Sequence, residues 1–396
     1  MKVAYVCADA GVPIFGTKGC SIHVQEIVRA FLQRGDTVDL YVARIGGDAP
    51  SDMVDCRVRE FRSVKHASVS EREAAGQEIA RRIAHAIPMQ RYDLVYERYS
   101  LWSDMTQILA GRNSLAGRRN VASILEVNAP LIDEQQSHRE LMDRASAERI
   151  ALNAFQHAQT TVAVSHEVAD YVRRFCRREA GICLSSVHVV PNGVDVNRFH
   201  PDVAPIDASD DFTIGFVGSL KPWHGVESLI AAFIRFVEAY PQSRLKIIGD
   251  GPMRDALERS VDERSSAADG RIKLAGSVSP DQMPSQLASL DVAVAPYLKS
   301  KGFYFSPLKV YEYMACGLPV VVSETGQLST LIDHGSNGLL YEPGNVDQLL
   351  KALVRLVEST ELRKKLGQAA RTTVVRRHSW QHCLDRILND SACTMA

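Results

Sequence analysis

Short β-rich runs alternate with longer amphipathic stretches along the chain, and this alternation constrains the fold more than any other feature. In the first half, segments with helical periodicity separate these apolar runs: Lys2–Ala8, Thr37–Val42, Asp93–Tyr96, Val121–Glu126 and Thr160–Val164. Such a rhythm is typical of a parallel sheet wrapped by crossover helices. The first half is therefore predicted to be a doubly wound α/β domain.

The alternation stops at a polar segment and then starts again. Residues His200–Asp211 contain two prolines and no apolar period, so we interpret them as an interdomain linker. Helical patterns at Glu227–Ala239 and Val346–Val357 then separate a second set of strand-like runs. These runs are Phe212–Val217, Leu245–Ile248, Arg271–Leu274, Val292–Ala295, Pro319–Val322 and Gly338–Tyr341.

The patterning thus predicts two doubly wound, Rossmann-like domains, at residues 1–200 and 207–375, which suits a chain of 396 residues. A helix is predicted over Arg371–Leu388, and its pattern assigns it to neither domain. Ligands bind at the carboxyl ends of the strands in open α/β sheets, so a deep interdomain cleft is the expected site. Many reactions share this architecture, and the residues must decide among them.

The composition excludes several classes of protein. The 46 basic and 47 acidic residues leave a net charge of -1, which disfavours a general nucleic-acid binder. No signal-peptide core and no apolar run of about 18 residues occurs, so we expect an intracellular, cytoplasmic protein. The eight cysteines form no C-x-x-C pair, which argues against a zinc ribbon, a redox dithiol or a disulfide framework.

A glycine-rich loop follows the first strand and leads into an amphipathic helix. It contains Gly16, Lys18 and Gly19, and small residues at a helix start let backbone N–H groups approach an anion. Because Lys18 precedes Gly19, the spacing excludes a P-loop, and phosphate binding and a plain turn fit equally well. His23 lies in the first helical turn, where a packing or surface role is the commoner one.

Two loops of the second domain also combine glycine with a helix start. Gly249–Pro252 resembles a dinucleotide fingerprint, but Arg254 replaces its third glycine and no acidic residue ends the next strand, which disfavours a dehydrogenase. A simple strand-to-helix turn is favoured there. The loop Gly218–Gly225 carries Lys221 and His224, which with the helix start are candidate partners for a diphosphate.

The segment from residue 302 to residue 322 is the densest in candidate groups. Ser306 and Pro307 predict a helix start and Gly317 its C-cap, so the helix has only about two turns. Glu312 lies inside it among apolar residues. A half-buried glutamate needs a protein donor or ligand hydroxyls such as those of a ribose, and the residues alone leave both open.

The sequence predicts no metal site and no cofactor. His378 and His382 are spaced i,i+4, but no third ligand is evident, so a helix-surface pair is favoured over a metal site. No D-x-D motif occurs, and with it the usual carboxylate anchor for Mg²⁺ or Mn²⁺ on a sugar-nucleotide diphosphate is missing. Phosphate chemistry here is expected to proceed without metal.

Six elements of a known family occur in order along the chain. They are the Gly16–Gly19 loop, Val190–Asp195 with Phe199, the Gly218–Gly225 loop, Ile248–Pro252, Glu312–Val320 and Asp333–Leu340. Together they resemble the GT-B glycosyltransferases usually labelled family 4. The resemblance implies metal-independent transfer of a sugar from a nucleotide diphosphate with retention of configuration. It also implies that the donor lies mainly on the C-terminal domain and that the C-terminal helix, residues 376–396, packs back on the first domain.

The resemblance further implies individual roles at the donor. Glu312 would grip the nucleotide ribose, while backbone amides near Pro307–Lys309 approach the diphosphate and the sugar. The residues implied at the nucleotide sugar are Gly19, Gly218, Ser219, Gly276, Ser277, Val278, Tyr304, Ser306, Pro307, Leu308 and Glu312.

Three departures from the family pattern involve four residues. Tyr304 stands eight residues before Glu312, where the family has a second glutamate, so the usual carboxylate contact to the donor sugar is lost. Ser219 and His224 stand where the family places the arginine and lysine that bind the diphosphate. Asn128 replaces a histidine that follows a central strand of the first domain. These departures indicate either a subfamily that binds its substrates with other residues or a site that has lost catalytic activity.

Sugar transfer from a nucleotide diphosphate requires that the negative charge of the leaving group be stabilised. Cleavage of the bond to the diphosphate places negative charge on the leaving oxygen, which cations, amides and a helix dipole stabilise in a dry cleft. Lys221, His224 and Lys309 are the candidate cations, and His23 and Asn128 would orient the acceptor. No protein nucleophile is required.

Two other functions and several identities stay open. The chain could be a sugar-nucleotide binding protein that has lost transfer, or a sugar-nucleotide 2-epimerase of the same architecture. A UDP- or GDP-sugar is the favoured donor, while the base, the sugar, the acceptor and the oligomeric state are not identified. Basic runs at 173–178 and 81–82 suit an anionic acceptor or a peripheral membrane contact, but a solvated helix face is favoured.

Overall fold

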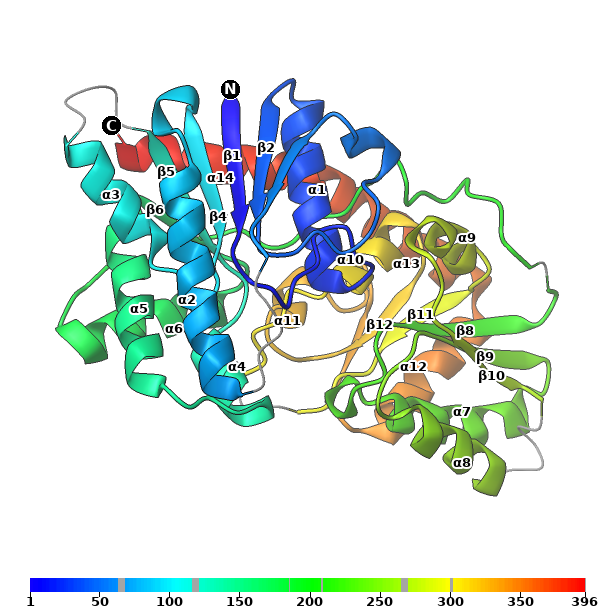
Figure 1. The fold of residues 1–396 in the computed structure, drawn as a ribbon. Coiled ribbons are helices and arrows are strands. Elements are labelled where there is room, and N and C mark those ends of the chain that lie inside the picture. Colours follow the sequence, from blue (N-terminus) through cyan, green and yellow to red (C-terminus); the bar gives the residue numbers. More distant parts are fainter. Residues whose placement is uncertain are drawn as a thin grey trace. The chain divides into compact units, whose positions relative to one another are not determined.

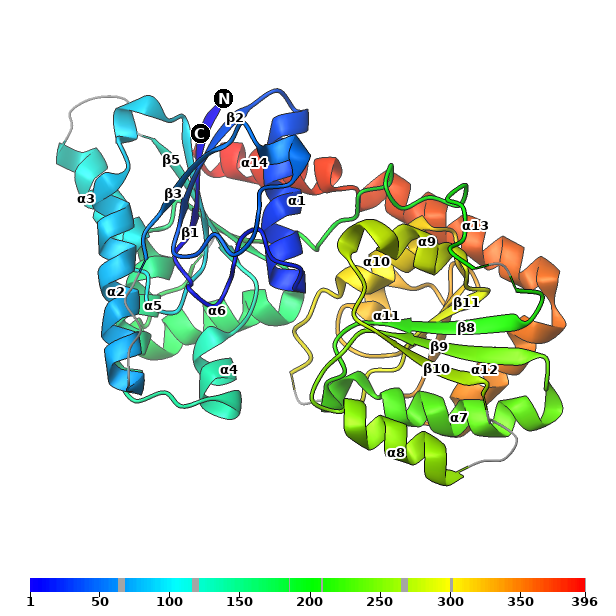
Figure 2. The same ribbon diagram turned by 45° about the vertical axis from the view of Figure 1, so that its right-hand side comes forward.

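The chain folds into two compact units. The computed structural model describes residues 1–62, 68–115, 121–184, 186–207, 209–264, 270–299 and 302–395. One unit comprises Met1–Asn192 and Trp380–Ala396, and the other comprises Gly193–Ser379. Figures 1 and 2 show the elements of each unit. No helix in these described ranges combines the length and the apolar character that crossing a membrane requires.

A parallel sheet forms the centre of the first unit. Among the described residues its strand order is β3-β2-β1-β4-β5-β6-β7, and every pair is parallel. The strands are β1 (Lys2–Cys7), β2 (Thr37–Val42), β3 (Arg57–Glu60), β4 (Leu94–Arg98), β5 (Ala122–Val127), β6 (Thr160–Ala163) and β7 (Val187–Val189). The direction of strand succession reverses between β1 and β4, as in doubly wound folds.

Helices cover this sheet in two groups. They are α1 (Gly19–Gln33), α2 (Val69–Ala86), α3 (Met105–Leu115), α4 (Leu131–His138), α5 (Arg144–His157), α6 (His166–Ala180) and α14 (Trp380–Met395). Helix α1 packs against α14, whereas α2, α3, α5 and α6 follow one another side by side (Figure 1). Ile79 and Ile83 of α2 are buried with Ala4 and Val6 of β1, which shows how an amphipathic helix closes one face of the sheet.

The second unit repeats this plan with a smaller sheet. Its described strands have the order β10-β9-β8-β11-β12-β13 and are all parallel. They are β8 (Phe212–Val217), β9 (Ser243–Ile248), β10 (Ile272–Gly276), β11 (Val292–Ala295), β12 (Val320–Ser323) and β13 (Leu339–Tyr341). Strand succession reverses between β8 and β11, so the topological switch point of this sheet lies there.

Two helical layers enclose the second sheet. The helices are α7 (Val226–Ala239), α8 (Arg254–Arg264), α9 (Met283–Ala288), α10 (Leu308–Ala315), α11 (Leu328–Leu331), α12 (Val346–Glu358) and α13 (Thr360–Arg377). Helix α7 packs against α8 and α12, and α10 packs against α13 (Figure 2). Phe233 and Leu349 belong to one buried cluster and Tyr313 and Met314 to another.

The predicted fold class is confirmed, and most predicted strands agree with the structure to within two residues. Strands β3 and β7 were not predicted. Both lie at the edges of the first sheet, and β3 reads Arg-Val-Arg-Glu, with a single apolar residue. An edge strand buries little surface, so its sequence lacks the apolar run by which buried strands are recognised.

The interpretation of His200–Asp211 as an interdomain linker is wrong. The described part of this segment lies inside the second unit, and the first crossing between units falls between Asn192 and Gly193. Ile206 N donates to Ser285 O at 3.1 Å, and Lys246 Nζ contacts Asp207 Oδ1 at 3.0 Å. Polar, proline-containing sequence thus marks an ordered surface segment here.

The segment predicted to be helical, Arg371–Leu388, is helical apart from a break of two residues, because α13 ends at Arg377 and α14 begins at Trp380. Between them the chain runs beside Val194, whose N–H donates to His378 O at 2.8 Å and which forms a parallel bridge with Ser379. A tertiary backbone contact therefore interrupts a segment with continuous helical character. The second crossing between units falls at this break, and α14 packs on α1 and β6 of the first unit.

Candidate active site

Three glycine loops meet at the carboxyl edge of the second sheet. Gly218 N donates to Ile248 O at 2.9 Å, and Gly249 N donates to Gly276 O at 2.8 Å. Gly249 has a φ of 135°, and a Cβ there would lie 2.0 Å from Gly218 O. Only glycine permits this approach. The loops after β8, β9 and β10 are therefore packed backbone against backbone, which brings Gly218 close to Gly276.

Hydrogen bonding by Tyr313 joins helix α10 to β8 at the switch point. Within the described residues the ladder between β8 and β11 comprises Ile214 and Gly215 of β8, so the backbone of Val217 lies beyond it. The Tyr313 hydroxyl contacts both backbone polar groups of Val217. It accepts from Val217 N at 2.7 Å and lies 3.3 Å from Val217 O. This arrangement carries Lys309 and Glu312 to the point where α/β sheets bind ligands.

The start of α10 agrees with the sequence prediction. Pro307 is its N-cap residue, and both Ser306 and Pro307 are buried. Ser306 Oγ lies 3.5 Å from the Tyr311 hydroxyl. Leu308 is the first helical residue, so the first amides of the helix, which have no partner within it, face its amino end. These amides and the helix dipole favour an anion there.

Lys309 is the most unusual cation of this region. Its Nζ is buried, and among the described residues it has no hydrogen-bond partner. It lies 4.2 Å from the centre of the Phe216 ring and 5.3 Å from that of Tyr297. Burial lowers the pKa of Lys309 to about 7, against an opposing effect of Glu312. The amine is therefore partly neutral near pH 7.

His224 does not act as a cation in this geometry. Its Nδ1 hydrogen-bonds the carbonyl oxygen of Ser219, so Nδ1 carries the proton and donates, and Nε2 keeps its lone pair. Burial lowers the pKa of His224 to about 3, and the charges of Lys309 and Lys221 act in the same direction. The ring meets Tyr297 edge-on at 5.3 Å. Of the three cations proposed from the sequence, His224 is thus the one whose side chain is neutral near pH 7.

The remaining predicted donor residues lie in α10, in the segment before it, or directly after β8 and β10. Glu312 is half-buried, the ring centres of Tyr304 and Phe305 lie 4.3 Å apart in a tilted arrangement, and Ser277 and Val278 directly follow β10. Lys221 lies with Nζ 5.7 Å from the Trp223 ring. The structure thus brings the predicted groups of the second unit to one edge of its sheet.

The first unit presents a separate set of groups. Gly19 begins α1, and the preceding loop is held by Gln25 Nε2, which donates to Ile14 O at 2.8 Å and to Gly16 O at 3.0 Å. Asn128 directly follows β5, and its Oδ1 is buried with no hydrogen-bond partner within the described part of the chain. A buried, unpartnered amide oxygen can accept a hydrogen bond from a ligand hydroxyl.

His23 is engaged by protein groups on both sides. The guanidinium of Arg98 lies 3.2 Å from Nδ1, and Glu126 Oε1 lies 3.3 Å from Nε2. Because arginine can only donate, Nδ1 accepts and Nε2–H points to the carboxylate. The ring is only 3% exposed and also meets Trp380 edge-on at 5.3 Å. The role predicted for His23, direct orientation of an acceptor, therefore has no free ring nitrogen in this arrangement.

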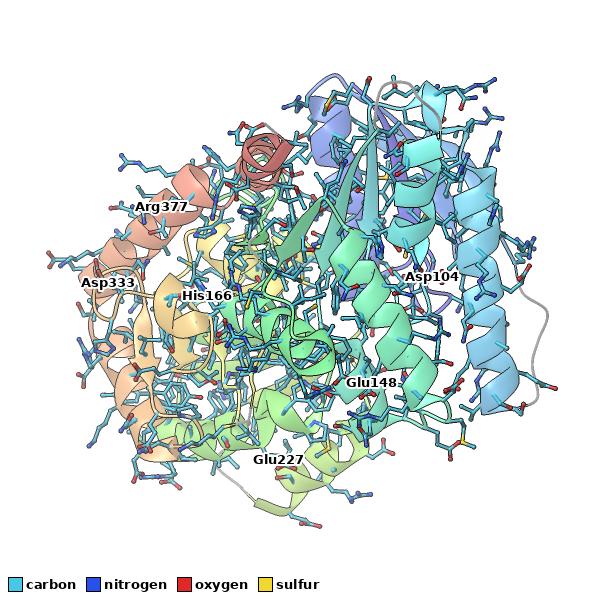
Figure 3. The ribbon with its side chains drawn as sticks, turned by 90° about the vertical axis from the view of Figure 1, so that its left-hand side faces the viewer. Asp104, Glu148, His166, Glu227, Asp333 and Arg377 are labelled. Atoms are coloured by element: carbon cyan, nitrogen blue, oxygen red, sulfur yellow. The ribbon has the colours of Figure 1, made fainter. Side chains whose placement is uncertain are left out.

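Two arginines of the basic run on α6, Arg173 and Arg178, contact acidic side chains. Glu148 of α5, labelled in Figure 3, accepts from Arg144 Nε at 2.8 Å and lies 3.8 Å from Arg178 Nη2. Arg173 lies 3.4 Å from Asp170. Among the described residues no group of three His, Cys, Asp or Glu side chains could hold a metal, and the ring of His378 packs at a tilt against Tyr311.

Two family models match nearly the whole chain. The model described as Glycosyltransferase Family 4 matches residues 17–198, and the model described as Glycosyl transferases group 1 matches residues 211–359. The chain belongs to the family 4 glycosyltransferases. The predicted family and enzyme class are thereby confirmed.

Individual relatives and solved structures agree with this assignment. The glycosyltransferase is 24% identical over 386 residues to a D-inositol 3-phosphate glycosyltransferase of Corynebacterium jeikeium, covering 92% of this chain and 88% of the relative. It is 32% identical over 175 residues to an uncharacterized glycosyltransferase of Methanocaldococcus jannaschii, covering 44% of this chain and 46% of that one. The structure of Anabaena Alr3699/HepE in complex with UDP is 19% identical, with a TM-score of 0.72 and coverage of 99% and 100%. This likeness identifies the fold as GT-B.

Sequence reasoning missed several groups of this glycosyltransferase. The guanidinium of Arg254, Nη1, lies 3.5 Å from where a Cβ of Gly276 would stand, yet Arg254 was noticed only as a departure from a dinucleotide motif. Tyr313 and Tyr297 were not singled out, because an aromatic residue in a short apolar helix or after a strand usually indicates packing. Their contacts with Val217 and Lys309 are tertiary, and no local pattern reveals them.

Proposed function

We propose that this glycosyltransferase moves a sugar from a UDP- or GDP-sugar to a hydroxyl group of an acceptor, with retention of configuration and without metal. The observation that carries the proposal is the switch point of the second unit, where the start of α10, the Lys309 amine and three packed glycine loops lie at one sheet edge. Amides, a helix dipole and a lysine suit the diphosphate of such a donor.

Similar proteins support the choice of donor. Complexes of Anabaena Alr3699/HepE contain UDP and UDP-glucose, and a relative from Mycobacterium tuberculosis is named as a GDP-mannose-dependent mannosyltransferase. Both are nucleoside-diphosphate sugars, so the shared chemistry is the diphosphate and the ribose. In this proposal Glu312 accepts the ribose hydroxyls, and Ser277 and Val278 lie beside the base.

Charge development explains the assigned roles. As the bond to the diphosphate breaks, its oxygen gains negative charge, which Lys309, Lys221 and the α10 amides stabilise. The leaving phosphate then takes the proton of the acceptor hydroxyl, and the new bond forms on the same face of the sugar. Because no protein nucleophile takes part, the absence of a carboxylate at Tyr304 alters sugar contacts and leaves this step intact.

The acceptor is proposed to bind the first unit. Asn128, with its buried amide oxygen at the end of β5, is the residue we assign to the acceptor hydroxyl. His23 contributes indirectly, since its ring is held between Arg98 and Glu126 and Glu126 lies two residues before Asn128 on the same strand. In this chain His23 is therefore a positioning residue rather than a catalytic one.

A donor screen tests the proposal. Thermal shifts with UDP-, GDP-, ADP- and dTDP-sugars identify the nucleotide, and NMR time courses with the selected sugar follow its fate with and without sugar acceptors. Transfer with an unchanged anomeric configuration is expected. Binding without turnover on any acceptor would instead indicate a sugar-nucleotide binding protein, and conversion of the sugar without an acceptor would indicate an epimerase.

A further inference from the structure

The second unit holds a buried amine for which the described part of the chain supplies no hydrogen-bond acceptor. Lys309 Nζ has no hydrogen-bond partner among the described residues. It lies against the rings of Phe216 and Tyr297, and a Cβ on Gly218 would come within 2.3 Å of it. The aromatic faces attract a cation but supply no lone pair comparable to that of an oxygen. The amine therefore lies next to the proposed phosphate loop without the hydrogen bonds that an ammonium ion needs.

The charged and titratable groups around Lys309 come from three elements. Glu312 lies one turn further along α10 and favours the ammonium form, whereas Lys221 and His224 come from the loop after β8. Tyr297 follows β11, and burial raises the pKa of its hydroxyl, so it carries no charge near pH 7. Desolvation outweighs the attraction of Glu312 and lowers the pKa of Lys309 to about 7.

We propose that Lys309 is the anion receptor of the donor site and takes up one proton from solvent when a nucleotide sugar binds. The inference rests on the proposed function, because it needs a diphosphate beside Gly218. Phosphate oxygens supply both the missing hydrogen-bond acceptors and a negative charge, and each favours the ammonium form over the amine. The balance is simple: one N–H bond forms, one proton leaves the solvent or buffer, and no other bond changes.

Proton uptake has a defined pH dependence. An amine that titrates near pH 7 is roughly 10% protonated at pH 8 and about 90% protonated at pH 6. If the bound state is fully protonated, binding takes up about 0.9 proton at pH 8 and only about 0.1 at pH 6. The sign follows from linkage: the complex binds more protons than the free protein, so donor affinity falls as pH rises above 7, by up to about tenfold per unit.

Calorimetry in buffers of different ionisation enthalpy measures this uptake directly. The probe is the nucleotide sugar selected by the donor screen, UDP-glucose or GDP-mannose, because a diphosphate diester lacks the second phosphate ionisation near pH 6 and contributes no proton itself. Titrations at pH 6 and pH 8 in HEPES and Tris compare the wild-type protein with Lys309→Met and Lys309→Arg. Lys351→Met is the matched control, since it removes an exposed lysine of α12 that lies outside the proposed donor site.

Uptake of about 0.9 proton at pH 8 by the wild type and by Lys351→Met, and of at most about 0.2 by the two Lys309 variants, supports the inference. Lys309→Arg is permanently charged, so it should bind without uptake. Wild-type binding without uptake, or uptake that persists in Lys309→Met, overturns it. If neither variant binds, wild-type uptake that is equal at pH 6 and pH 8 overturns it as well. Failure of every nucleotide sugar to bind the wild type overturns the proposed function instead.

Discussion

The two units bury their charged groups in opposite ways. In the first unit Arg98, His23 and Glu126 contact one another at 3.2 and 3.3 Å. In the second, Lys309 Nζ lies against aromatic rings with no hydrogen-bond partner in the described part of the chain. A paired buried charge is held in place and is costly to break, whereas an unpaired one responds to an incoming anion. The comparison indicates a fixed framework in the first unit and a responsive site in the second.

Breaking the network of the first unit should have the largest effect. Arg98→Met removes the donor to His23 Nδ1 and a buried positive charge that stabilises the Glu126 carboxylate, so we expect the free energy of unfolding to fall by about 3–5 kcal/mol. Urea denaturation measures the loss, and Arg235→Met, at an exposed pair with Asp347, should cost at most about 1 kcal/mol. Equal losses of unfolding free energy in the two variants would show that the buried network contributes no more to stability than an exposed ion pair.

A change at the proposed donor site should affect binding and leave stability nearly unaltered. Glu312→Gln weakens charge-assisted bonds to ribose hydroxyls worth about 1.5–3 kcal/mol, so nucleotide affinity should fall at least tenfold. Calorimetry measures the affinity, and the melting temperature serves as the control for folding. Unchanged affinity with an intact fold would show that Glu312 has a structural role. The second unit would then lose one of the residues proposed to bind the donor.

The charge of the responsive site should affect turnover as well as donor binding. Replacing Lys309 or Lys221 by Met keeps the apolar stem and should lower kcat about tenfold, if one contact is worth ~1.4 kcal/mol in the transition state. His224→Asn should have a smaller effect, because its imidazole is neutral near pH 7. Steady-state kinetics with the identified donor decides. If both Met variants keep the wild-type kcat and donor KM, the backbone amides carry the charge alone.

Chelation should have the smallest effect. In the proposed site lysines and helix amides neutralise the diphosphate, so activity in EDTA should equal that of the untreated enzyme. Initial rates before and after chelation measure this. Complete loss that Mg²⁺ or Mn²⁺ restores would refute metal-independent transfer and assign the diphosphate a metal partner in place of lysine.

The candidate site was only partly predictable from the sequence. The short helix that begins after Pro307 and carries Glu312 was predicted, because its start, its C-cap and its following strand are local signals. The engagement of His23 was not, since its partners Arg98 and Glu126 are 75 and 103 residues away in the sequence. Nor was the neutral state of His224, which depends on a carbonyl and on two lysines that the fold brings near it.

By itself the sequence determined two parallel α/β domains, their buried strands and the family, because apolar periodicity and short motifs are local properties of the chain. Only the tertiary structure decided where the units divide and which charges are paired. The helix predicted over Arg371–Leu388 breaks at Ser379 because Val194 pairs with the backbone there, about 185 residues away in sequence. Likewise, the protonation of Lys309 depends on the rings and the glycine loop that bury its amine, and burial of this kind arises only once distant segments have packed together.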